Sequence, residues 1–90
     1  MREKYQKLQK FMNKTPRQVT TLTLSFDQIE VLIGAQLPKS AAKYRQWWAN
    51  QRNNQHRPQA RAWMSAGFKV DKVDLLAGQV IFSRYSGLFT

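Results

Sequence analysis

Apolar residues recur near the start of the chain at the spacing of an amphipathic helix. Tyr5, Leu8, Phe11 and Met12 are separated by three or four positions, which predicts a helix over residues 2–13. The opposite side of this helix carries Lys4, Lys7, Lys10 and Lys14. Residues 13–16, which include a proline, end the element. The first prediction is therefore a helix with a basic outer face.

An alternating run rich in β-branched residues follows at positions 19–25 and predicts a short strand. Ser25 stands three residues before Gln28, which is the spacing of a capping box, so a second helix is expected to begin at once. Its apolar side comprises Phe26, Ile29, Leu32 and Ile33. Gly34 is expected to end it, because glycine readily adopts the left-handed conformation of a helix C-cap.

The pattern is less regular between Gly34 and Pro58. Residues 39–48 contain good helix formers without a continuous apolar stripe, and they predict one helical stretch. Residues 50–57 contain no apolar side chain and predict an exposed polar loop. Pro58 suits the first turn of a further helix that Gly67 would end. Residues 68–75 and 79–85 then predict two strands joined by a tight connection, a hairpin.

The order of these elements, α-β-α-α-α-β-β, predicts an α+β fold with a three-stranded antiparallel sheet, and it is the order of a winged-helix domain. A winged helix usually joins its second and third helices by a short turn. Here residues 34–57 form a long basic insertion, so either an extra helix is inserted or the fold is a different small α+β arrangement. We expect residues 1–90 to form a single domain, with a loosely held tail from about residue 86.

Charge narrows the range of partners. The 90 residues include 15 Lys and Arg but only 5 Asp and Glu, for a formal net charge of +10, and positions 31–70 contain no acid at all. Such a balance favours nucleic acid, an anionic membrane or an acidic protein as partner. The chain has no cysteine and no apolar run of the length of a membrane span, so we expect no membrane association and a cytoplasmic location.

The candidate contact residues lie in and around this acid-free stretch, where Arg and Lys would pair with phosphates and amides would reach base edges. Trp47 would either stack on a base or complete the core, and Trp48 is the stronger core candidate of the two. Asn50 would either read an adenine edge or cap a turn. The predicted nucleic-acid-binding set is Lys39, Lys43, Arg45, Trp47, Asn50, Arg52, Asn53, Asn54, Gln55, His56, Arg57 and Arg61.

Catalytic chemistry finds little support in the sequence. His56 is the only histidine, which excludes a two-histidine metal site. The five acids are scattered, and the four glycines are better explained as stops and turns than as a phosphate-binding loop. We therefore expect no enzymatic activity, no cofactor and no metal.

Several motifs resemble a family of short bacterial and phage proteins of unknown function, over about residues 5–84. They are a Gly-x-x-Leu-Pro turn, a Trp-Trp-x-Asn element, an Ala-x-Ala-Trp helix and a Gly-Phe-x-Val strand. The matching residues are Gly34, Leu37, Pro38, Trp47, Trp48, Asn50, Ala60, Ala62, Trp63, Gly67, Phe68 and Val70. Members often carry an acidic residue and Ser-His after the Trp-Trp-x-Asn element, whereas residues 51–56 here are more basic. The resemblance implies a discrete domain of unknown function.

The sequence thus predicts a nucleic-acid-binding module, most readily for double-stranded DNA, that uses the basic 39–61 segment. An alternative is a protein interaction factor, such as a phage inhibitor of a host enzyme or an antitoxin-like protein, whose basic face binds an acidic protein. A third is binding of single-stranded DNA or RNA through exposed aromatic residues. A homodimer would suit a palindromic DNA site.

Overall fold

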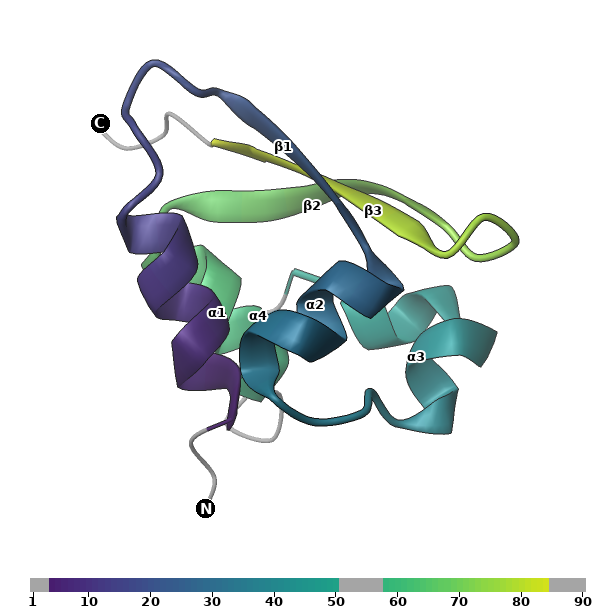
Figure 1. The fold of residues 1–90 in the computed structure, drawn as a ribbon. Helices are drawn as coiled ribbons and strands as arrows, with labels where there is room; N and C mark the ends of the chain where they lie inside the picture. The colour runs from purple at the N-terminus through teal and green to yellow at the C-terminus, as the bar shows by residue number, and fades with distance from the viewer. Residues whose placement is uncertain (1–3, 51–57, 85–90) are drawn as a thin grey trace.

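The computed structural model describes residues 4–50 and 58–84, and it shows a layer of helices packed against one small sheet (Figure 1). The elements are α1 (Lys4–Asn13), β1 (Thr21–Ser25), α2 (Phe26–Ile33), α3 (Lys39–Lys43), the 3-10 helix η1 (Arg45–Trp48), α4 (Pro58–Ser65), β2 (Phe68–Asp74) and β3 (Gln79–Arg84). The predicted α+β class is therefore confirmed. In the described part of the chain, no helix is long and apolar enough to span a membrane.

The sheet has the order β1-β3-β2, and both strand pairs are antiparallel. The last strand along the chain is thus the central one, as Figure 1 shows. Leu24 pairs with Val80, and Val80 pairs in turn with Val73 on β2, so an apolar row crosses the sheet. The register shifts between Val70 and Lys72, which marks a β-bulge in β2. The predicted three-stranded antiparallel sheet is confirmed.

The start and the end of α2 follow the sequence prediction closely. The Ser25 hydroxyl accepts a hydrogen bond from the Gln28 N–H, and the Gln28 side chain accepts one from the Ser25 N–H, which completes a capping box. Gly34 has a φ of 70°, in the left-handed region, and its N–H donates to the Glu30 carbonyl. These local signals fix where the helix begins and ends, because they satisfy backbone groups that would otherwise lack partners.

A column of aromatic rings joins the helices to the sheet. Phe26 stacks on Trp48 with ring centroids 5.2 Å apart, and Trp48 stacks on Trp63 at 5.8 Å. Trp63 in turn contacts Phe82 at 5.5 Å. Trp48, Trp63 and Phe82 are fully or almost fully buried. Since large aromatic side chains dominate the burial energy of small domains, this column forms the centre of the core.

Residues 39–48 do not form the one helical stretch that the sequence predicts. Tyr44 is extended, with φ −125° and ψ 125°, and divides the stretch into α3 and η1. The break turns Trp48 inward, so that its indole N–H donates to the Ala41 carbonyl over 2.8 Å. Ala41 and Trp48 are both buried. The sequence had indicated this irregularity only by the absence of a continuous apolar stripe.

Candidate nucleic-acid interface

Three of the predicted basic residues lie exposed on two helices of the described chain. Lys39 and Lys43 are exposed on α3, and Arg61 is exposed on α4. The Lys43 ammonium lies 5.9 Å from the centre of the Tyr44 ring, which is itself 55% exposed. The structure therefore leaves these three cations accessible to an anionic partner.

Arg45 has a partner within the fold. Its guanidinium donates a hydrogen bond of 2.7 Å to the Val73 carbonyl and so fastens η1 to β2. A charge-assisted hydrogen bond of this kind is stronger than a neutral one. Arg45 is exposed, but it has a structural role that the sequence did not indicate.

Trp47 is partly buried between elements. Its ring meets Trp48 edge-on at 4.7 Å and lies 6.2 Å from the Tyr5 ring of α1. Its carbonyl accepts a hydrogen bond from the Gln59 amide at the start of α4. Of the two roles predicted for Trp47, the structure shows the packing role, and it confirms Trp48 as the deeper core residue.

The Asn50 side chain is hydrogen-bonded within the fold. Its amide donates to the Val70 carbonyl at 3.0 Å, and its Oδ1 accepts from the Val70 N–H at 2.8 Å. The same Oδ1 accepts from the Trp63 indole N–H at 3.0 Å. The carboxamide thus pairs with β2 as a neighbouring strand would and also holds the central tryptophan. This arrangement requires both the donor and the acceptor of an amide.

The remaining predicted residues lie outside the described part of the chain. They are Arg52, Asn53, Asn54, Gln55, His56 and Arg57. The tail predicted from about residue 86 also lies outside it.

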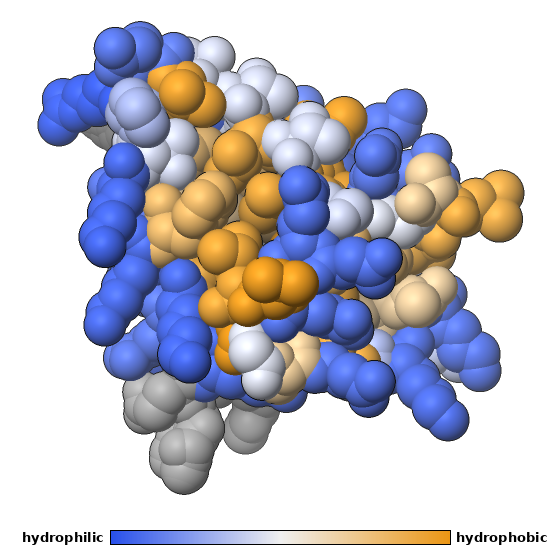
Figure 2. Space-filling model, viewed as in Figure 1, coloured by the Kyte–Doolittle hydropathy of each residue, from blue (hydrophilic) through white to orange (hydrophobic). Residues whose placement is uncertain are grey.

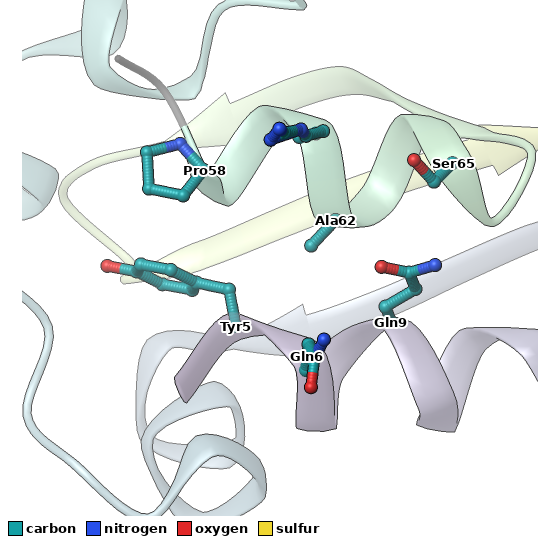
Figure 3. A pocket seen from close by; sticks show the side chains of 7 residues that line it. Tyr5, Gln6, Gln9, Pro58, Ala62 and Ser65 are labelled. Atoms are coloured by element: carbon teal, nitrogen blue, oxygen red, sulfur yellow. The ribbon is translucent and has the colours of Figure 1, made fainter. Parts of the chain in front are cut away.

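A polar groove between α1 and α4 is the main feature that sequence reasoning missed. The two helices lie against each other, and a hollow of about 460 Å³ opens between them. It is lined by Tyr5, Gln6, Gln9, Pro58, Arg61, Ala62 and Ser65. In Figure 3, Gln9 points from α1 toward α4, Ala62 points back toward α1, and the Tyr5 ring lies below Pro58. A smaller hollow of about 210 Å³ adjoins it, lined by Gln6, Gln9, Lys10 and Asn13.

The sequence does contain a signal for this groove. Gln6, Gln9 and Asn13 recur at positions i, i+3 and i+7, which places their carboxamides along one side of a helix. The lysines of the same helix form a second polar stripe beside it. Its partner helix could not be identified from sequence, because the packing of α1 against α4 joins segments about 50 residues apart.

Tyr5 stands at one end of the groove. Burial raises the pKa of the Tyr5 hydroxyl above its ordinary value of 10.0, because ionisation would place a charge in a poorly solvated position. The Lys4 ammonium lies 5.2 Å from the centre of the Tyr5 ring. The hydroxyl therefore remains a neutral hydrogen-bond donor at physiological pH.

Acidic residues are confined to two elements of the described chain. Asp27 and Glu30 lie on α2, and Asp71 and Asp74 lie on β2. The Glu30 carboxylate accepts from the Leu37 N–H, and Asp74 accepts from the Ala77 N–H at the hairpin turn. Helices α1, α3 and α4 and the 3-10 helix η1 carry basic residues and no acid. The positive potential is thus concentrated on those four elements.

A different surface lies where α1, β1 and α2 meet. Figure 2 shows an apolar area in the middle of this face with hydrophilic residues around it. It includes a hollow of about 370 Å³ lined by Phe11, Leu24, Asp27, Gln28, Val31 and Leu32. Val31 is 82% exposed. This apolar face contrasts with the polar groove between α1 and α4.

These features define a small basic α+β domain in which helices cover a three-stranded sheet. The chain belongs to a family described as a domain of unknown function (DUF7662), whose family model matches residues 5–86. This match confirms the predicted resemblance to a family of unknown function over nearly the whole chain. No curated protein and no solved structure gives a significant match to the chain.

Proposed function

We propose that this protein is a non-enzymatic nucleic-acid-binding module whose main ligand is double-stranded DNA. The observation that carries the proposal is the separation of charge: in the described residues, α1, α3, η1 and α4 bear cations and no acid. A surface of one sign costs stability through self-repulsion unless a partner neutralises it. A phosphate backbone is such a partner, and binding to it releases condensed counterions.

The topology supports duplex DNA over other polyanions. The helices are followed by the β2–β3 hairpin, and the hairpin's second strand lies at the centre of the sheet. We propose that this order of elements is that of a winged helix, in which α4 would take the place of the third helix and the hairpin that of the wing. On this proposal, α3 and η1 are the extra segment between the second and third helices of that fold. Their buried residues, Ala41 and Trp48, make the segment part of the core.

The proposed cellular location and origin of the protein follow from its composition and motifs. A cysteine-free chain that binds nucleic acid suits a reducing, cytoplasmic environment, and its motifs suit a bacterial or phage protein. With one histidine in the chain, a binding role is better supported than catalysis.

A protein partner with an acidic surface is the second candidate. The apolar face of Phe11, Leu24, Val31 and Leu32 favours it, because phosphate contacts make no use of an exposed apolar hollow. A partner that covered both this face and the nearby lysines of α1 would be an acidic protein with an apolar centre.

Direct binding measurements test the proposal. Fluorescence anisotropy with duplex DNA, single-stranded DNA and RNA at several salt concentrations should show the tightest binding to the duplex. If six phosphates are contacted, log K should fall with a slope of roughly −5 against log salt. No binding to any of the three ligands at low salt would overturn the proposal and favour the acidic protein.

A charge reversal on α3 locates the surface. Lys39→Glu should weaken duplex binding about tenfold at low salt, because a contact is lost and a repulsion gained. The domain should still fold, since Lys39 is exposed at the first residue of α3, where a carboxylate suits the helix dipole. Arg17→Glu is the matched control: it makes the same charge change at an exposed position between α1 and β1. Equal losses in both variants would place the contact surface elsewhere.

A further inference from the structure

We infer that the groove between α1 and α4 holds the sugar–phosphate backbone of one nucleic-acid strand. This inference rests on the proposed function and extends the contact surface from the basic 39–61 segment onto α1. It assigns contacts to Gln6, Gln9 and Arg61, with Lys10, Asn13 and Ser65 extending the same surface.

The groove has the chemistry of a backbone site. Most hydrogen bonds from proteins to DNA go to phosphate and sugar, and Arg, Lys, Ser, Asn, Gln and Tyr side chains supply them. The lining of the two adjoining hollows contains each of these residue types and no carboxylate. The buried Tyr5 hydroxyl adds a donor that stays neutral, as described above. Every polar group around the groove is therefore compatible with an anionic strand.

The shape of the groove favours the backbone over the bases. The hollow is recessed between two helices, and its floor is formed by a buried small side chain, Ala62. Base edges in a duplex lie inside a groove and are reached by an element that protrudes. The phosphate backbone is instead a convex ridge, which fits into a concave surface. Contacts between the groove and the phosphate backbone would be independent of base sequence.

The groove is also well placed relative to the predicted contact residues. Arg61 belongs both to the groove and to the predicted set, and Pro58 at its rim directly follows Arg57 in the sequence. At the same end, the Gln59 amide reaches the Trp47 carbonyl, which links the start of α4 to η1. A strand in the groove would thus continue toward η1.

Isosteric charge changes on α1 test the inference. The double variant Gln6→Glu/Gln9→Glu introduces two carboxylates into the groove with almost no change in shape. The control Gln18→Glu/Gln36→Glu makes the same net charge change at exposed positions in the connections after α1 and after α2. Binding to a 20-base-pair duplex would be measured by anisotropy at low salt, and thermal unfolding would confirm that all variants fold.

We expect the groove variant to lose about tenfold more affinity than the control, because two nearby phosphates would be repelled. The opposite variant, Gln6→Lys/Gln9→Lys, should bind more tightly than the wild type. Both effects should be equal for AT-rich and GC-rich duplexes, since backbone contacts carry no base sequence.

The experiment distinguishes a failure of the groove assignment from a failure of the proposed function. If the wild type binds duplex DNA and the groove and control variants lose the same affinity, the groove assignment is wrong while the proposed function stands. Losses that depend on base sequence would assign the groove to base readout and overturn the backbone assignment. If the wild type fails to bind duplex DNA at low salt, both proposals fall together.

Discussion

Tyr5 shows how one buried side chain makes stability depend on pH. The hydroxyl has a raised pKa in the folded state, whereas in the unfolded chain it ionises near its ordinary value of 10.0. Above that pH the unfolded state binds fewer protons than the folded state. The free energy of unfolding therefore contains a contribution that is fully present below about pH 10 and is lost as the pH rises further.

The Tyr5→Phe variant should lack this contribution. We expect the difference in unfolding free energy, wild type minus Tyr5→Phe, to fall between about pH 9 and pH 11, as measured by urea unfolding at each pH. Tyr44→Phe makes the same change at a largely exposed position and serves as the control. Parallel pH dependence of wild type and Tyr5→Phe would contradict the argument.

Residues differ in how far the sequence alone reveals their role. Trp48 was predicted as the stronger core candidate of the Trp47–Trp48 pair and is buried, and the bond between Ser25 and Gln28 followed from their spacing of three. The role of Arg45 could not be predicted from the sequence, because its acceptor, the Val73 carbonyl, lies 28 positions away. A charged side chain on an acid-free stretch suggests an external partner. Only the fold reveals that a backbone carbonyl is already within reach.

At the scale of elements, the Asn50 carboxamide connects the segment after η1 to the edge of β2 and to α4. Its three hydrogen bonds reach the Val70 backbone and the Trp63 indole, although Asn50 itself is exposed. Trp63 is completely buried, so its N–H would lack this acceptor if the amide were removed. An unsatisfied buried donor costs about 1–3 kcal/mol.

Asn50→Ala should therefore lower the free energy of unfolding by about 1–3 kcal/mol in urea unfolding experiments. Asn50→Asp keeps an oxygen for both N–H donors but places its second carboxylate oxygen against the Val70 carbonyl, so it should also be destabilising. Gln36→Ala, at an exposed position, should change stability by no more than about 0.5 kcal/mol. An Asn50→Ala protein as stable as this control would show that the hydrogen bonds of Asn50 contribute nothing to the free energy of unfolding.

Element boundaries were predictable wherever a local signal sets them. The helix from Phe26 to Ile33 has a capping box and a terminal glycine, and its limits agree with the sequence prediction. The division of residues 39–48 at Tyr44 was not predictable, since it depends on where Ala41 and Trp48 meet the rest of the core. The groove between α1 and α4 likewise required the packing of two distant helices.

At the scale of the whole molecule, a net charge of +10 should give stability and binding opposite responses to salt. Without a ligand, the cations repel one another in the folded state, and added salt screens this repulsion. Binding to DNA weakens with salt, because the entropy gained by releasing condensed counterions falls as the bulk salt concentration rises.

We therefore expect Tm of the free protein to rise between about 20 mM and about 300 mM NaCl, a range over which the Debye length falls below about 8 Å. Over the same range the affinity for duplex DNA should fall steeply. Thermal unfolding followed by circular dichroism, together with anisotropy on the same samples, checks both trends. A Tm that falls with salt would mean that attractive ion pairs outweigh repulsion.

The overall class of the fold could be predicted from the order of its elements, whereas the order of its strands could not. Periodicity located three strands, but any of them could have been central. The pairing of Thr21 with Ser83 joins strands that are far apart in the sequence and has no local sequence signal. Such pairings are set by burial of the apolar side of each strand against the core. That burial exists only once the whole domain has assembled.

The central place of β3 has a consequence for how this protein reaches its native state. Both strand ladders in the sheet depend on residues 79–84, so neither can form before that segment arrives. Closing β1 onto β3 also encloses more than 50 residues in one loop, which is an entropic cost that slows folding. A chain interrupted before Gln79 would retain helical segments without a sheet to cover them. Folding is therefore expected to be a single late event that joins the beginning of the domain to its last strand.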